Sequence, residues 1–269
     1  MQTHEPPFRF RQGTRPLLIS IPHAGTYVPP ALAARFTGAA QQVPDTDWHL
    51  ERLYDFADEL GASVLVATHS RYVIDLNRPP DNASLYPGQS VTSLCPIDIF
   101  DNTPIYAKPG DEPDEAEIDD RRKTIWEPYH QQLAAELARI RAVHGVAGLW
   151  DAHSICSVVP RFFEGTLTDL NLGTGKGTSC AAALGERLLA DAKSASGYTS
   201  VLNGRFTGGY ITRHYGQPAN NVHAVQLEMT WSCYMAEHPP YEYLPETAKG
   251  ISPHLRRMLE TMLNFLEGH

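Results

Sequence analysis

Two short strings in this chain each place a histidine directly after an apolar run that is typical of a buried strand. The strings are IPHAG, which contains His23, and WDAHS, which contains His153. A histidine at the carboxyl end of a parallel strand lies at the edge of the sheet where α/β proteins build their sites. Because neutral imidazole is a common zinc ligand, two such histidines can converge on one ion. The sequence therefore favours an α/β fold with a mononuclear metal site.

Composition narrows the class of protein and of its partners. The 269 residues are 42% hydrophobic, which is enough for a full core, and we expect one catalytic domain over residues 1–269. The net charge of −9 makes nucleic acid a poor partner, although a local arginine cluster can still bind a small acidic molecule. No apolar run approaches the roughly 20 residues that span a bilayer, so no membrane association is expected.

The compartment is predicted from the first residues and from the cysteines. The start of the chain, MQTHEPPFRFRQG, is polar and lacks the pattern of a secretory signal. The four cysteines form no CxxC pair, so a disulfide framework is not expected. We therefore expect a cytoplasmic protein, and the sequence makes no prediction of its oligomeric state.

Apolar runs that alternate with helical patterns predict a three-layer α/β/α fold with a mixed, mostly parallel sheet. Strands are expected at residues 16–21, 62–68, 72–76, 146–152, 198–202 and 223–229. Helices are expected at residues 45–60, 115–144 (with a kink at Pro128), 178–193 and 253–266. The segment 77–113 is rich in proline, asparagine and glycine, and it is expected to be a long irregular loop.

A carboxylate-rich string, PDTDWH, lies between the two histidine strings and offers a third ligand. Asp45 or Thr46 fits the N-cap of the helix expected to run to Leu60, and Asp47, in the first turn, could face the site. A hydrolytic zinc site usually keeps three protein ligands and one open position. Two histidines and one aspartate satisfy that number, although a histidine is more often a core or capping residue than a ligand.

Glu228 stands in a late apolar strand, within the string QLEM. A charged side chain there is costly unless it is paired or functional. One interpretation is an edge strand with Glu228 facing water. The other is a general base held beside the metal.

Arginines and one asparagine near two apolar segments could bind carboxylates. Arg71, Asn77 and Arg78 belong to SRYVIDLNR, and Arg213 belongs to GGYITRH. The planar guanidinium fork suits a bidentate contact with a carboxylate. The same arginines could equally be surface residues, with Asp75 as a partner.

The order and combination of six strings resemble the N-formylglutamate amidohydrolase family. The resemblance covers about residues 17–231, and it rests on IPHAG, DTDWH, SRYVIDLNR, WDAHS, DLNLGT and QLEM. It implies a fold like that of the zinc exopeptidases and aspartoacylases, a phosphorylase/hydrolase-like α/β/α sandwich. It also implies cleavage of N-formyl-L-glutamate to formate and L-glutamate, at the end of a histidine-degradation route.

The resemblance further implies a set of metal ligands and one divalent ion, with zinc as the first choice. The ligands would be His23, Asp47 and His153. The wider class places its acidic ligand three residues after the first histidine, where this chain has Thr26. The acid must therefore come from elsewhere, and Asp45 is the substitute for Asp47.

By the same resemblance, Glu228 would act as the catalytic base, and Arg71 would help to stabilise the oxyanion. Asn77 and Arg78, joined by Arg213, would hold the carboxylates of the substrate.

Three alternatives stay open on the sequence. The chain could be a metallo-carboxypeptidase or deacylase that acts on another N-acyl amino acid. It could be a non-catalytic module that binds small acidic molecules. It could also be a cysteine amidase that uses Cys156, which lies close in sequence to Asp151 and His153.

Overall fold

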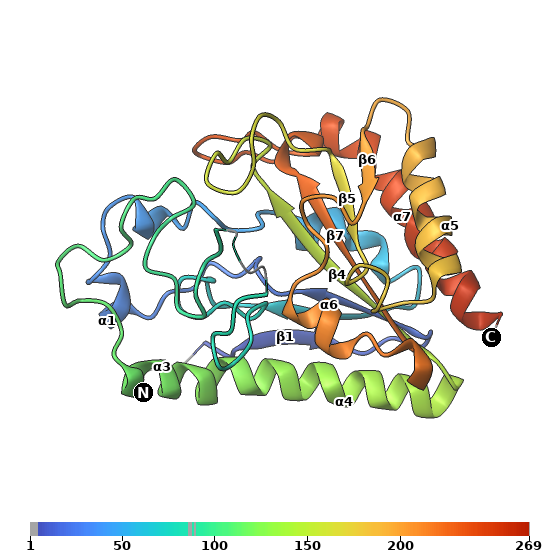
Figure 1. The fold of residues 1–269 in the computed structure, drawn as a ribbon, viewed down its shortest axis with the longest axis horizontal. Helices are drawn as coiled ribbons and strands as arrows, with labels where there is room; N and C mark the ends of the chain where they lie inside the picture. Colours follow the sequence, from blue (N-terminus) through green and yellow to red (C-terminus); the bar gives the residue numbers. More distant parts are fainter. Residues whose placement is uncertain (1–4, 86–87, 89, 269) are drawn as a thin grey trace.

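The computed structural model describes residues 5–85, 88 and 90–268, which fold around one mixed β-sheet (Figure 1). Its strands are β1 (Phe8–Arg11), β2 (Leu17–Ile21), β3 (Ser63–Ala67), β4 (Ala147–Ile155), β5 (Leu170–Gly173), β6 (Ser200–Leu202) and β7 (Val222–Thr230). The strand order is β1-β3-β2-β4-β7-β5-β6. The four central strands run parallel, whereas β1 at one edge and the β5–β6 pair at the other run against them. The predicted mixed, mostly parallel sheet is confirmed.

Helices cover both faces of this sheet and make the predicted three layers. The helices are α1 (Pro30–Ala33), α2 (Leu50–Leu53), α3 (Glu115–Arg121), α4 (Glu127–His144), α5 (Ala182–Ser194), α6 (Tyr210–Tyr215) and α7 (Pro245–Glu267). Helices α4 and α6 pack on one face, and α5 and α7 pack on the other (Figure 1). Short 3-10 turns are η1 (Ala40–Gln42), η2 (Asp55–Ala57), η4 (Pro218–Asn220) and η5 (Trp231–Cys233).

Strand periodicity divides the core between the two faces. In β2, Leu17 and Ile19 join the apolar cluster under α5 and α7, and Leu18 joins the cluster under α4. Successive side chains on a strand point to opposite faces, which explains this division. Gly148 in β4 lets α7 approach closely, because a Cβ there would come within 2.5 Å of Leu266 Cδ1.

The predicted helix at 45–60 is wrong over most of its length. The structure has only the single turn of α2 and the 3-10 turn η2. The residue before α2 is His49, which has a left-handed φ of 61°. Asp45 is not an N-cap, because its carboxylate accepts hydrogen bonds from the Tyr72 hydroxyl (2.6 Å) and the Phe100 amide (2.9 Å). Long-range bonds to a buried carboxylate replace the local capping bond here.

The predicted strand at 72–76 is also wrong, since this segment is a buried loop without ladder partners. Its apolar residues satisfy the hydrophobic pattern, while its backbone bonds within turns, as from Val73 N to Ser70 O. The described part of 77–113 is irregular, as predicted, and only isolated bridges occur in it. Its Leu94, Ile99 and Ile105 are buried, so the excursion contributes to the core. Residues 86–87 and 89 lie outside the described part.

The helix predicted at 115–144 is confirmed as α3, a π-helical segment η3 (Arg122–Trp126) and α4. In place of a kink at Pro128, the structure has the wider π-helical turn just before it. The helix runs on without a break in Figure 1. The last helix, α7, begins eight residues earlier than predicted, at Pro245, and includes Pro253. The helix predicted at 178–193 begins only at Ala182.

Four helices or strands were not predicted: β1, α1, β5 and α6. Strand β5 lies where a loop is expected, and both β1 and β5 are only four residues long. Short strands of this kind carry too little periodicity to be recognised. They form because the neighbouring strands β3 and β7 offer backbone groups with which they can form hydrogen bonds.

Two further expectations concern the chain as a whole. Among the described residues, none of the helices is long and apolar enough to span a bilayer. The four cysteines are free thiols, so the expected lack of disulfides is confirmed.

Candidate metal centre

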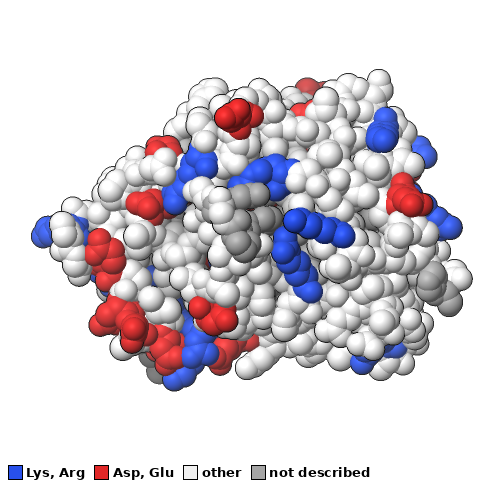
Figure 2. Space-filling model, in the orientation of Figure 1, with Lys and Arg blue, Asp and Glu red and all other residues white. Residues whose placement is uncertain are grey.

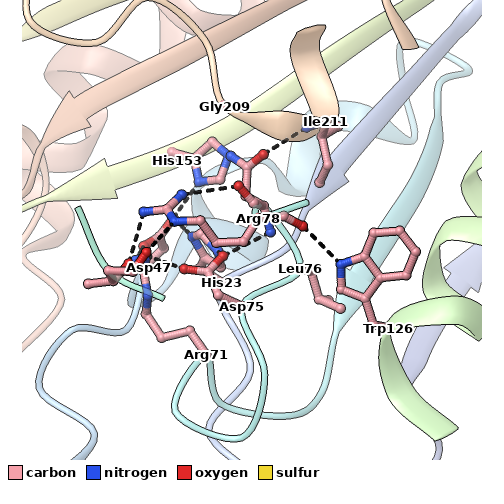
Figure 3. A network of polar contacts seen from close by, with 12 residues as sticks. His23, Asp47, Arg71, Asp75, Leu76, Arg78, Trp126, His153, Gly209 and Ile211 are labelled. Carbon is pink, nitrogen blue, oxygen red and sulfur yellow. Dashed lines mark hydrogen bonds and ion pairs between the residues drawn. The ribbon is translucent and has the colours of Figure 1, made fainter. Parts of the chain in front are cut away.

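The two predicted histidines meet at the carboxyl ends of β2 and β4. One ligand atom from each of His23, Asp47 and His153 lies within 4.8 Å of the others, and all three side chains are buried. The two imidazole rings have their centroids 4.9 Å apart. Figure 3 shows the three side chains pointing toward one another. This arrangement could hold one metal ion.

Local backbone contacts fix this convergence. His23 lies in the turn after β2, and its carbonyl accepts a hydrogen bond from the amide of Asp47 at 3.0 Å. Gly25 follows, where a Cβ would come within 2.3 Å of the His69 carbonyl oxygen. His153 lies inside β4, not after it as predicted, because β4 pairs with β7 as far as Ile155.

Each histidine presents Nδ1 to Asp47 and Nε2 to a second carboxylate. Oδ2 of Asp47 lies 3.2 Å from Nδ1 of His153 and 3.8 Å from Nδ1 of His23. On the far side of the rings, Asp75 Oδ1 lies 2.7 Å from Nε2 of His23, and Asp151 Oδ2 lies 3.2 Å from Nε2 of His153. Metal-binding histidines typically have their second nitrogen bonded to a carboxylate in this way.

The donor set fits a divalent cation. Oδ1 of Asp47 is a buried carboxylate oxygen with no hydrogen-bond partner among the described residues. Arg71 lies 4.0 Å from this oxygen but donates no hydrogen bond to it, and a cation bound there would satisfy the buried carboxylate directly. Two imidazoles and one carboxylate are also a ligand set that zinc accepts.

The surroundings of His23 and Asp75 favour a neutral imidazole and an ionised carboxylate, the protonation states that suit metal binding. Burial, helped by the charge of Arg71, lowers the pKa of His23 and so keeps its imidazole neutral. Burial alone would raise the pKa of Asp75, but His23 and Arg71 hold it well below its usual range. Burial opposes protonation of His153 as well, yet Asp151 and Asp47 raise its pKa well above 6.5. A metal ion binding there would displace that proton.

The polar loop at 70–78 supports the site from the side of α4. Arg71 Nη2 donates to Asp75 at 2.7 Å, and Nδ2 of Asn77 lies 2.9 Å from Nε2 of His153. The π-helical segment contributes Trp126, whose indole donates to the carbonyl of Arg78 at 3.1 Å (Figure 3). The predicted strand is absent because these polar anchors hold the loop.

A cavity opens next to the three converging side chains. Among the described residues, its lining contains His23, Arg71, Asn77, Arg78, Ser90, Val91, Phe100, His153, Ser154, Ile155, Phe162, Arg205, Phe206, Gly209, Gln226 and Glu228. Glu228 is the register partner of His153 across β4 and β7, so the two lie side by side. Strand β7 is central and Glu228 is 8% exposed, so the interpretation as a water-facing edge residue is wrong. Burial raises the pKa of Glu228 to about 8.

The remaining predicted residues differ in whether they line the cavity or could reach a metal ion. Arg71 and Arg78 line the cavity, whereas Arg213 is not among its described lining residues. Arg213 instead donates to the Gly208 carbonyl (2.8 Å) and to the Thr207 hydroxyl (2.8 Å). Asp45 is not in the group that could hold a metal. Burial raises the pKa of Asp45 to about 6, and Tyr72 and Phe100 already bind its oxygen.

Sequence reasoning missed three charged residues at the site, Asp75, Asp151 and Arg205, along with the uncharged residues that complete the cavity lining. Both aspartates stand within apolar runs, and the argument applied to Glu228 would have found them. Arg205 lies between short glycine-containing strings, and no local signal marks it.

The fold and site define an α/β protein with a buried histidine–carboxylate group, able to hold a metal ion, at the carboxyl edge of its sheet. The chain belongs to the N-formylglutamate amidohydrolase family, whose model matches residues 15–235.

Relatives and solved structures agree with this membership. The chain is 51% identical to an N-formylglutamate deformylase from Pseudomonas aeruginosa over 254 residues, which cover 94% of this chain and 95% of that protein. A deformylase from Pseudomonas putida is 49% identical over 254 residues, covering 94% of each chain. The crystal structure of N-formylglutamate amidohydrolase from Ralstonia eutropha has a TM-score of 0.82 at 22% identity, covering 97% of this chain and 98% of that one. That likeness shows the fold.

Proposed function

We propose that this protein is a metal-dependent amidohydrolase that cleaves N-formyl-L-glutamate to formate and L-glutamate. The observation that carries the proposal is the buried His23–Asp47–His153 group, in which one carboxylate oxygen of Asp47 accepts no hydrogen bond, beside a cavity lined by Glu228 and arginines. Two relatives, at 51% and 49% identity, are named N-formylglutamate deformylases, and these names support the choice of substrate.

Zinc is the first choice for the ion, because it suits two imidazoles and one carboxylate. When bound, such an ion supplies a Lewis acid and lowers the pKa of water. His23, Asp47 and His153 would hold it. Asp75 and Asp151 would orient the two imidazoles from behind.

Glu228 is the proposed general base and acid. Its carboxylate would take a proton from the attacking water and deliver that proton to the nitrogen of the departing amine. A carboxyl group with a raised pKa holds such a proton more readily, and burial raises the pKa of Glu228 to about 8. The positive charge of Arg71 opposes this shift, and a cation held by His23, Asp47 and His153 would oppose it as well, so both favour the ionised form that begins the reaction.

Arg71, Asn77 and Arg78 are the proposed groups around the substrate. Arg71 carries a buried positive charge beside Asp47 and Asp75, where it can stabilise charge that develops on the formyl oxygen. Asn77 and Arg78 would hold a substrate carboxylate. Arg213 would act indirectly, because it donates a hydrogen bond to the backbone carbonyl of Gly208.

The alternatives differ in what they require of the site. A cysteine amidase needs an activated thiolate, but burial raises the pKa of Cys156, and Cys156 is not among the described cavity-lining residues. A deacylase for a larger acyl group and a non-catalytic binding module both remain to be tested by assay. We also propose that the protein is cytoplasmic and acts at the end of histidine breakdown.

The test compares N-formyl-, N-acetyl- and N-succinyl-L-glutamate as substrates, each with and without a chelator. We expect hydrolysis of the formyl compound, loss of activity with the chelator, and recovery on adding Zn²⁺. Turnover of a larger acyl group in preference to formyl would favour the deacylase. Binding without any turnover would favour the module, and inactivation by thiol alkylation alone would favour the cysteine amidase.

A further inference from the structure

A third arginine, Arg205, lines the same cavity as Arg71 and Arg78. It comes from the segment between β6 and α6. Strand β6 is at one edge of the sheet, whereas the loop that carries Arg78 follows β3, near the other edge. Its Nε donates to the carbonyl of Phe162 at 2.5 Å, and its guanidinium carbon lies 5.1 Å from the centre of the Phe206 ring. These contacts fix the guanidinium against the aromatic wall of the cavity.

The three arginines lie in different electrostatic settings. Arg71 forms an ion pair with Asp75 at 2.7 Å and lies 4.0 Å from Asp47, so its charge is tied to the candidate metal centre. Arg78 donates to the carbonyl and the hydroxyl of Thr92. Arg205 donates to the carbonyl of Phe162, which positions its guanidinium at the cavity wall. Guanidinium groups held in this way suit incoming carboxylates.

The proposed substrate carries two carboxylates at different distances from the bond that breaks. The α-carboxylate is attached to the same carbon as the amide nitrogen, so it must lie close to the metal ligands. Arg78 directly follows Asn77, which contacts His153, and this suits the α-carboxylate. The γ-carboxylate lies two methylene groups further out, and Arg205, which lines the cavity together with Phe162 and Phe206, reaches it from a different segment of the chain.

We propose that Arg205 binds the side-chain carboxylate of the substrate and is the residue that selects an acidic side chain. This inference rests on the proposed function. Ile155, Val91 and Phe206 line the cavity as well and offer apolar surface to the methylene groups. Figure 2 shows Lys and Arg side chains gathered over the middle of one face of a chain whose net charge is −9, in keeping with an anionic ligand.

The test compares kcat/KM for N-formyl-L-glutamate and N-formyl-L-glutamine, whose side chains have the same length but end in a carboxylate and in a neutral amide. For Arg205→Gln we expect a loss of about 100-fold on the glutamate compound and little change on the glutamine compound. Binding of L-glutamate, measured by calorimetry, should weaken by a similar factor, whereas binding of L-glutamine should not. Arg161→Gln is the matched control, because Arg161 packs on the ring of Phe162, whose carbonyl Arg205 contacts, but is not among the described lining residues.

The outcomes separate this inference from the function on which it rests. If the wild-type protein hydrolyses neither compound, the proposed function is wrong and the role of Arg205 falls with it. If the wild type is active and Arg205→Gln loses the same factor on both compounds, only the role of Arg205 is overturned. Should Arg205→Gln not fold, Arg205→Lys keeps the charge, and its smaller loss should again be confined to the glutamate compound.

Discussion

Nε2 of His23 lies 2.7 Å from Oδ1 of Asp75, and this contact turns Nδ1 of the same ring toward Asp47. Asp75 also accepts hydrogen bonds from Arg71 (2.7 Å) and from the amide of Asn77 (2.8 Å). One buried carboxylate therefore orients a candidate metal ligand and anchors the loop that carries Arg71, Asn77 and Arg78.

Asp75→Asn should weaken metal binding without removing a ligand. The amide lacks the charge that holds the imidazole of His23 in place, so we expect the affinity for Zn²⁺ to fall about 10- to 100-fold. Competition with a chelator of known affinity measures this directly. Asp81→Asn is the control, because Asp81 is exposed on the same loop. An unchanged affinity in Asp75→Asn would show that Asp75 does not orient His23.

Glu228→Gln should abolish most turnover while leaving the metal bound. The amide cannot accept the proton of the attacking water, so we expect a loss in kcat of about 100-fold or more. Metal content, measured by mass spectrometry, should stay at the wild-type level because Glu228 is not a ligand in this account. A fully active variant would remove Glu228 from the mechanism.

Arg78→Gln should act on the other end of the substrate from Arg205→Gln. Loss of one charge-assisted bond to the α-carboxylate is expected to lower kcat/KM for N-formyl-L-glutamate by about 10- to 100-fold. The compound in which the α-carboxylate is an amide should be affected much less. Equal losses on both compounds would argue against a carboxylate clamp at Arg78.

His130 predicts a specific dependence of stability on pH. It is buried between Trp126 and Tyr215, and burial lowers its pKa to about 3. Below about pH 6.5 the unfolded chain takes up a proton that the folded protein excludes, so stability falls as the pH falls from 6.5 toward 3.

The measurement is the free energy of unfolding of the wild type and of His130→Gln at several pH values. The wild type should lose up to about 1.4 kcal/mol more per pH unit than the variant between pH 6 and pH 4. His238→Gln, at an exposed position, should keep the wild-type slope. Parallel curves for wild type and His130→Gln would contradict a neutral buried imidazole.

Long periodic segments of the fold were predictable, and segments held by distant polar contacts were not. The α4 helix and the strands β2, β4 and β7 follow clear hydrophobic patterns, and they were predicted to within a few residues. The region 45–60 has an equally good helical pattern, but buried bonds from Tyr72 and Phe100 to Asp45 override it. Such bonds join residues far apart in the sequence, and no local pattern contains them.

The site divides in the same way. His23 follows β2, and His153 and Glu228 lie near the carboxyl ends of β4 and β7, so their convergence could be predicted from the parallel sheet. Asp47 rather than Asp45 lies within reach of both imidazoles, and that placement depends on tertiary contacts that the sequence does not contain. Arg205 lies on a separate irregular segment, so its place beside the cavity depends on tertiary packing alone.

The most direct test of the central claim is the metal content of the purified protein, determined together with its activity on N-formyl-L-glutamate. We predict one divalent ion per chain in the wild type, and loss of both ion and activity in His23→Ala and in His153→Ala. A wild-type protein that is fully active with no bound metal, or single histidine variants that keep both metal and activity, would contradict the account.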